Sequence, residues 1–342
     1  MPEHNSFTGF AIALAWPATY CKQPGSWYDD ITHLLNISTN RFYQVGHAAL
    51  VLVEAGTRKC HYFDFGRYHA PFKHGRVRGE ITDPGLTIRT KAELSEDGGR
   101  IDNFREILEE LQSNHECHGD GDLHAAYCGV NFEKAFAKAR QMQEDSPIPY
   151  GPFKRKGSNC SRFVCTSILA GNPAWNITFD LKYLVFLTPT PLNNVNALKH
   201  KSVVPKPFYQ PVLKPAPFKN KPLLKDTLPE PEKPWNIPLN AQWLSGEGAG
   251  SWFSIEKHEE EYWITRFNDA GETECKGIFT GSESPDFNIE RPYQFVHLSH
   301  CNQVRIKQDK RIITFQKLEE ERHKATEGKL SVEEEMNHFP GN

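Results

Sequence analysis

The segment Gly157-Ser158-Asn159-Cys160-Ser161-Arg162-Phe163 has the pattern of a helix start that carries a reactive thiol. It follows a loop rich in proline and glycine and opens an apolar run, 163–170, which Gly171 is suited to end. Ser158 or Asn159 is suited to cap the first turn. In that turn, unpaired N–H groups and the helix dipole favour a thiolate. The pattern therefore predicts a cysteine nucleophile at position 160.

Composition limits the classes of function. The chain has 342 residues, enough for two domains, and a net charge of −3, which does not favour binding to nucleic acid. The apolar run 10–16 is too short to span a membrane and is expected to be a buried strand. Eight cysteines (21, 60, 117, 128, 160, 165, 275 and 301) lack the spacing of a disulfide framework. With no export signal apparent, they are expected to be free thiols in the cytoplasm.

Changes in composition predict four segments. Residues 1–200 are expected to form an α+β domain. Residues 201–234, in which prolines alternate with lysines, are expected to be a semi-rigid linker because such a segment cannot bury a core. Residues 235–317 contain short β-like runs broken by turns, typical of a small all-β barrel or sandwich. Residues 318–342 form a charged tail.

Within the first domain, apolar patterning predicts the elements that surround the thiol. Strands are expected at 10–16, 42–53 and 59–65, and a short helical patch at 27–35. Two amphipathic helices are expected to begin at the caps Asp102 and Asn131. Residues 177–187 are expected to return to the sheet as a strand.

A cysteine nucleophile needs a histidine as base, and that histidine needs an orienting group. His47 heads an apolar strand directly after Gly46. A hairpin turn centred near residues 55 and 56 places Asp64 of the next strand beside His47. A register shift of one residue would turn Asp64 to the other face. A histidine in a strand can also be purely structural, so the prediction depends on the combination of His47, Asp64 and Cys160.

Three motifs together resemble a known family: Gly46-His47-Ala48-Ala49-Leu50-Val51, Tyr62-Phe63-Asp64-Phe65-Gly66 and the segment 157–163. They are similar to the circularly permuted branch of the NlpC-type papain-fold cysteine hydrolases, which includes YiiX-like and lecithin:retinol-acyltransferase-like proteins. In that branch the histidine precedes the cysteine, as here. The resemblance covers roughly residues 7–190 and implies a papain-like fold, in which a helix that carries the cysteine packs on an antiparallel sheet that carries the histidine.

The resemblance also implies thiol-dependent hydrolysis of a peptide, amide or ester, or transfer of its acyl group. Cys160 would attack the carbonyl, His47 would move the proton and Asp64 would orient the imidazole. The Cys160 N–H would stabilise the oxyanion, with Tyr150 or Asn159 as a second donor. Retinol-acyltransferase-like proteins follow Asn-Cys with Glu-His-Phe, whereas this chain has Ser161-Arg162-Phe163. Lipid specificity is therefore not expected to carry over.

Other residues have alternative interpretations. Arg67, Arg76 and Arg78 could bind a substrate carboxylate or phosphate, or could be solvated loop charges. The cluster from His115 to Cys128 could bind zinc, but its spacing matches no closed site, and we expect no metal and no cofactor. A non-catalytic protein with an idle thiol, whose β-domain binds a protein partner, is the rival interpretation. The expected function is a cysteine amidase or peptidase.

Overall fold

The computed structural model describes residues 7–23, 42–117, 119–185, 188–207, 226–281 and 287–318. The chain forms two compact units, one of residues 1–232 with 244–251, and one of residues 233–243 with 252–342. The predicted helical patch at 27–35, most of the predicted linker and nearly all of the predicted tail lie outside the described residues. The two units are described separately below.

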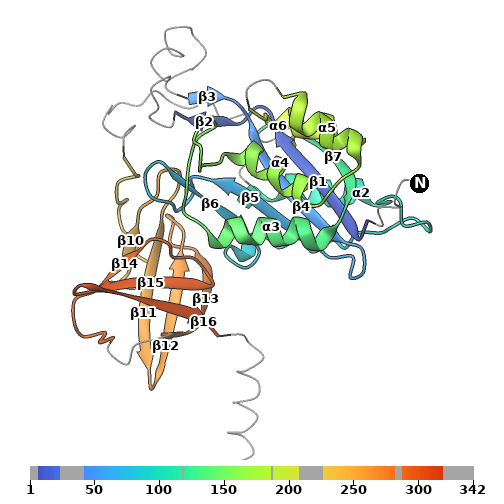
Figure 1. The fold of residues 1–342 in the computed structure, drawn as a ribbon. Helices are drawn as coiled ribbons and strands as arrows, with labels where there is room; N and C mark the ends of the chain where they lie inside the picture. The colour runs from blue at the N-terminus through green and yellow to red at the C-terminus, as the bar shows by residue number, and fades with distance from the viewer. Residues whose placement is uncertain are drawn as a thin grey trace, which may run out of the picture. The chain divides into compact units, whose positions relative to one another are not determined.

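The first unit contains a seven-stranded antiparallel sheet (Figure 1). Its order is β8 (Ile148–Pro149), β6 (His74–Gly79), β5 (Cys60–Gly66), β4 (His47–Glu54), β1 (Gly9–Trp16), β7 (Leu123–Val130) and β9 (His200–Val204). Strand β9 extends past the predicted domain boundary at residue 200. A separate pair, β2 (Tyr20–Lys22) and β3 (Phe42–Gln44), lies outside this sheet.

Strand β1 is buried on both faces, as its apolar run predicts. Its alanines Ala11, Ala13 and Ala15 face one core, where small side chains allow helices to approach closely. Its larger side chains, from Phe10 to Trp16, face the other core. This division into a small-residue face and a bulky face gives the sheet a hydrophobic core on each side.

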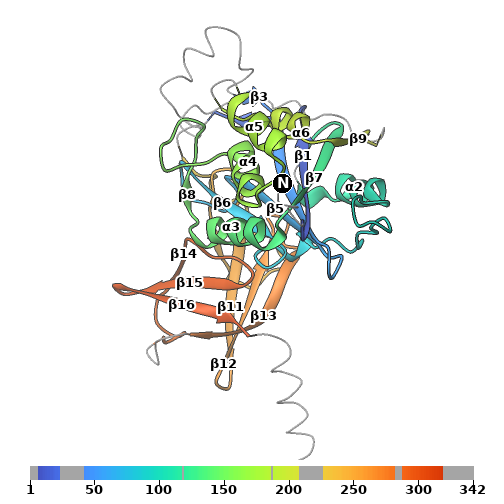
Figure 2. The ribbon, with the colours of Figure 1, turned by 45° about the vertical axis from the view of Figure 1, so that its right-hand side comes forward.

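Helices cover both faces of the sheet (Figure 2). The alanine face packs against α3 (Phe132–Glu144), α4 (Cys160–Ala170), α5 (Trp175–Tyr183) and α6 (Pro191–Ala197). The other face packs against α2 (Phe104–Ser113), flanked by the short helices η1 (Pro84–Leu86) and η2 (His115–Cys117). The expected α+β class is confirmed, with the helix that begins at Cys160 on the sheet.

Three local expectations differ from the structure. Residues 175–183 form α5 and not a strand, because the buried residues Ile177 and Leu181 are four apart, which matches a helical face. The cap of α2 is Asn103, one residue after Asp102. The predicted strand 42–53 is split into β3 and β4 at Gly46, whose φ of +77° breaks the extended chain. The predicted cap Asn131 is confirmed, since its side chain accepts from the Lys134 N–H.

The second unit is all-β, as expected, and its sheet is rolled toward a barrel (Figure 1). The strand order is β10 (Gln242–Leu244), β11 (Ser251–His258), β12 (Glu261–Phe267), β13 (Thr273–Gly281), β16 (Arg311–Lys317), β15 (Gln303–Gln308) and β14 (Gln294–Val296). The Gln242 side chain bridges the two edge strands, because it donates to the Tyr293 carbonyl at 3.1 Å and accepts from the Phe295 N–H at 3.1 Å.

The expectation that every cysteine is a free thiol is wrong. Cys275 on β13 and Cys301, just before β15, form a disulfide, with 5.9 Å between their Cα atoms. The sequence could not indicate this bond because the two cysteines are 26 residues apart and only the folded sheet brings them together. The other six cysteines are free.

Within the described residues, no helix is both long and apolar enough to cross a bilayer.

Candidate active site

The thiol of Cys160 lies in the first turn of α4. Asn159 caps this helix, since its Oδ1 accepts from the Arg162 N–H at 2.8 Å, and Gly171 follows the last turn. Cys160 is 8% exposed, and its Sγ lies 3.9 Å from the Ser161 hydroxyl. The local sequence thus gives the thiol the helix-start environment that favours a thiolate.

The pKa of the Cys160 thiol differs from those of the other free cysteines. Burial opposes ionisation of Cys160, but a hydrogen bond and the charge of His47, together with the Ala48 N–H and the Ser161 hydroxyl, lower its pKa overall. Burial raises the pKa of the remaining five thiols to about 11 or 12; these are Cys21, Cys60, Cys117, Cys128 and Cys165. Among the six free cysteines, Cys160 is therefore the one whose pKa lies below the usual value of a thiol.

His47 is held at the first position of β4 by its neighbours. A side chain at position 46 would bring its Cβ to 3.0 Å from the Trp16 carbonyl oxygen, and the φ of this residue is +77°. Glycine therefore suits this turn. The imidazole stacks on the ring of Trp16, with 5.9 Å between centroids, and meets the Tyr68 ring edge-to-face. It is 3% exposed. The ring orientation is thus fixed by packing on two sides.

His47 and Asp64 lie side by side, although the register differs from the expected one. Asp64 pairs with Ala49, because the hairpin turn is centred one residue later than expected. The shift is two residues, so both side chains stay on one face. Nε2 of His47 lies 3.5 Å from Oδ2 of Asp64, a loose ion pair rather than a tight hydrogen bond.

These contacts set the protonation state of His47. Burial opposes the imidazolium, but the interactions with Asp64 and Cys160 and their negative charges raise the pKa of His47 to about 9. The arrangement therefore favours a thiolate on Cys160 beside an imidazolium on His47, the charge pair that many cysteine hydrolases use.

Asp64 is completely buried and remains ionised because Arg78 clamps it. Nε and Nη2 of Arg78 donate to the two carboxylate oxygens at 2.9 and 2.5 Å, and the Tyr62 hydroxyl donates at 3.2 Å. The guanidinium also lies 4.3 Å from the centroid of the Tyr68 ring. Burial alone would raise the pKa of Asp64, but the Arg78 charge and the His47 contact hold it well below its usual range.

The other two arginines considered for substrate binding are also paired with carboxylates of the fold. Arg76 is fully buried and forms a bidentate pair with Asp83, at 2.7 and 2.6 Å. Arg67 is nearly buried and pairs with Glu247 at 2.5 Å. Because all three guanidinium groups neutralise internal carboxylates, we do not assign them direct contact with a substrate.

Cys160 opens onto a cavity of about 320 Å³. Its walls are largely apolar, with Tyr43, Val45, Phe153 and Pro191 among the residues that line it. The two residues considered as oxyanion donors, Tyr150 and Asn159, also line this cavity. A cavity of this size and character suits the acyl part of a small substrate.

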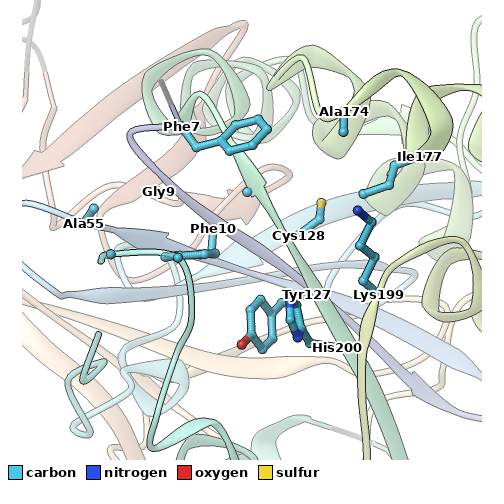
Figure 3. Close-up of a pocket in the computed structure, with 13 residues that line it drawn as sticks. Phe7, Gly9, Phe10, Ala55, Tyr127, Cys128, Ala174, Ile177, Lys199 and His200 are labelled. Carbon is cyan, nitrogen blue, oxygen red and sulfur yellow. The ribbon is translucent and has the colours of Figure 1, made fainter. Parts of the chain in front are cut away.

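A second cavity, of about 200 Å³, is lined by other residues and does not include Cys160 in its wall. Figure 3 shows the residues that line it. Its wall includes Cys128, and the His200 ring stacks on the Tyr127 ring, with 4.5 Å between centroids. Burial raises the pKa of the Cys128 thiol to about 12, so this cavity does not present a thiolate.

The segment from His115 to Cys128 contains residue types that can bind zinc. In the described part of the chain, which omits residue 118, no three His, Cys, Asp or Glu side chains gather into a metal-binding group.

Several residues at the site have roles that sequence patterns did not indicate. The pairing of Arg78 with Asp64 could have been found, since the two lie directly opposite on β6 and β5 once the register is known. Glu247, which is 180 positions from Arg67, carries no local signal. Cys21 and Lys22 reach the cavity through β2, which sequence patterns did not predict. Tyr43 reaches it through β3, which they did not separate from the predicted strand 42–53.

Comparisons with known proteins give two family matches. Residues 11–177 match the family model described as type VI secretion system effector TseH-like, and residues 241–318 match the DUF6695 C-terminal domain. A crystal structure titled as that of the type VI secretion system effector TseH aligns with 19% identity and a TM-score of 0.37, over 58% of this chain and 93% of that one. No curated protein matches the chain. The first match contains Cys160, His47 and Asp64, and it does not single out the permuted NlpC-type branch.

Proposed function

We propose that the protein is a thiol-dependent hydrolase of amide or ester bonds, with a papain-like first domain. Cys160 is the nucleophile, His47 the general base and acid, and Asp64 the group that orients His47. The observation that carries the proposal is geometric: Cys160 starts helix α4 at the wall of a cavity, and His47 lies 3.5 Å from the buried carboxylate of Asp64. The interaction between Cys160 and His47 lowers the pKa of the thiol and raises that of the imidazole, while burial raises the pKa of every other free thiol.

In the proposed reaction, the Cys160 thiolate attacks the substrate carbonyl and forms a tetrahedral oxyanion. The Cys160 N–H supplies one donor, and Tyr150 or the amide group of Asn159 supplies the second. The His47 imidazolium then gives its proton to the leaving amine or alcohol, which leaves a thioester on Cys160. His47 next takes a proton from water as the resulting hydroxide attacks the thioester. The carbon–sulfur bond then breaks, the acid departs, and the thiolate of Cys160 is restored beside the imidazolium of His47.

Acyl transfer by the same three residues is the second candidate. The apolar lining of the cavity favours it, because a wall of Tyr43, Val45 and Phe153 would hold an acyl group and limit access of water to the thioester. An alcohol or amine would then replace water as the acceptor.

The match to TseH-like effectors supports a further part of the proposal, that the hydrolase acts as an effector of a type VI secretion system. The disulfide between Cys275 and Cys301 is compatible with such a role, since disulfides persist in oxidising compartments. A cytoplasmic location stays a prediction from cysteine usage, as does a protein partner of the β-domain.

The pH dependence of hydrolysis tests the proposed charge pair. Turnover of 4-nitrophenyl acetate should rise at low pH as Cys160 ionises, below the usual range of a thiol, and should fall as pH rises through about 9, where His47 loses its proton. The measurement is the initial rate between pH 4 and 11, corrected for the reaction without enzyme.

A rate that keeps rising through pH 9 would contradict the role of the imidazolium, because an unpaired thiol reacts faster as more of it ionises. No turnover at any pH, with a panel of esters and peptide amides, would favour the non-catalytic interpretation.

A further inference from the structure

Residues 244–251, here called the return segment, fold with the first unit. They run from the last residue of β10 to the first residue of β11, so their chain neighbours belong to the second sheet. The segment pairs with the loop after β5: Tyr68 and Ala249 form a parallel bridge, and the Gly248 N–H donates to the Arg67 carbonyl at 3.0 Å. It is therefore a structural part of the unit that carries Cys160.

Glu247 is the buried anchor of the return segment and is 1% exposed. Its Oε1 accepts from Arg67 at 2.5 Å and its Oε2 accepts from the Lys73 N–H at 2.9 Å. Gly246 lets the backbones approach closely, because a Cβ there would lie 2.8 Å from backbone atoms of His69. A buried carboxylate with both oxygens used is strongly specified in position.

Arg67 links Glu247 to residues in the wall of the candidate active site. Its guanidinium also donates to the carbonyl oxygens of Lys22 and Gln23, and it lies 4.8 Å from the centroid of the Tyr150 ring. Lys22 and Tyr150 line the cavity onto which Cys160 opens. One guanidinium thus joins Glu247 to two residues that line that cavity.

We propose that Glu247 is a positioning residue for the substrate-binding cavity: through Arg67 it fixes the Lys22 wall and the Tyr150 ring that receive the acyl part of the substrate. The inference rests on the proposed function. It implies that residues 1–232 alone lack a group needed to shape the cavity, although they contain Cys160, His47 and Asp64.

Two alkylating reagents of different size separate positioning from thiol chemistry. Iodoacetamide reports the reactivity of the Cys160 thiolate, which depends on His47, whereas N-benzyl-iodoacetamide must also fit the cavity. In the full-length chain, Glu247→Gln should alkylate with iodoacetamide at a rate within about twofold of the unmodified protein and with the benzyl reagent roughly tenfold more slowly, because small displacements of a binding wall have large effects on positioning. Mass spectrometry of the Cys160 peptide gives both rates.

Arg67→Lys provides a second variant, since it keeps the charge but loses the fork that reaches Glu247 and Lys22 together. It should give the same separation between reagents, and it decides the question if Glu247→Gln does not fold. Glu274→Gln is the matched control, because Glu274 pairs with Arg266 at 2.6 Å in the second unit, and it should change neither rate.

The proposal would be overturned if Glu247→Gln and Arg67→Lys reacted with both reagents as fast as the unmodified protein does. It would also be overturned if both variants lost the same factor in rate with the two reagents, because that result indicates a purely structural role. Failure of the proposed function would look different. In that case the unmodified protein would show an ordinary, slow reaction of Cys160 with iodoacetamide at pH 6, while the ratio between reagents would still report on the cavity.

Discussion

Cys160→Ser should reduce the turnover of an ester or amide substrate by at least roughly 10³-fold, because loss of the nucleophile removes most of the catalysis that a triad provides. The thermal midpoint should change little, since the substitution is small and the thiol lies at a cavity wall. The measurement is the initial rate with 4-nitrophenyl acetate and with peptide amides, together with thermal unfolding of both proteins.

Cys165→Ser is the matched control on the same helix. Cys165 is also buried, its Sγ donates to the Leu181 carbonyl at 3.6 Å, and burial raises its pKa to about 11. Serine can keep that hydrogen bond, so activity should remain. A Cys160→Ser protein that retains activity equal to that of Cys165→Ser would exclude Cys160 as the nucleophile.

Asp64→Asn should reduce turnover by roughly 10²-fold, within the range that general acid–base catalysis contributes. The reason is electrostatic: asparagine can still orient the imidazole, but without the carboxylate charge the pKa of His47 falls and the imidazolium is less populated. The substitution also leaves the buried Arg78 without its counter-charge, so the free energy of unfolding should fall by roughly 3 kcal/mol. Turnover and urea unfolding measure the two effects.

Asp83→Asn separates the two effects. The substitution breaks the ion pair between Asp83 and Arg76. Arg76 lies on β6, as Arg78 does, and its pair with Asp83 is about as buried as the pair of Arg78 with Asp64. Its stability should fall by a similar amount while its turnover, measured where the protein is folded, stays near that of the unmodified chain. If Asp83→Asn loses as much activity as Asp64→Asn, the loss reflects stability, and Asp64 has no special part in catalysis.

Local sequence was sufficient to predict the elements that carry the candidate site. The start of α4 follows from Asn159 and Gly171, because capping depends on neighbouring residues alone. The shared face of His47 and Asp64 follows from alternation along two strands, and it survived an error of two residues in register because side chains alternate with a period of two. The all-β class of residues 235–317 follows from short runs separated by turns.

What sequence could not predict depends on contacts distant along the chain. The partner of Arg67 is Glu247, and nothing near either residue signals a return of the chain to the first unit. Arg78 was considered for substrate binding because a free arginine and a paired arginine look alike in sequence, and only the register of β5 and β6 separates them. The apolar residues of 177–187 are compatible with both helical and strand spacing. Residues 175–183 form a helix, in which Ile177 and Leu181 are buried on one face.

The central claim is that His47 holds Cys160 as a thiolate, and the pH dependence of Cys160 alkylation in the unmodified protein and in His47→Ala tests it most directly. The rate with iodoacetamide, followed by mass spectrometry, reports the ionised fraction of this one thiol. We expect the unmodified protein to react rapidly at mildly acidic pH and His47→Ala to titrate at clearly higher pH, because the hydrogen bond and charge that lower the pKa of Cys160 are gone while burial remains. Identical titration curves for the two proteins would contradict the account.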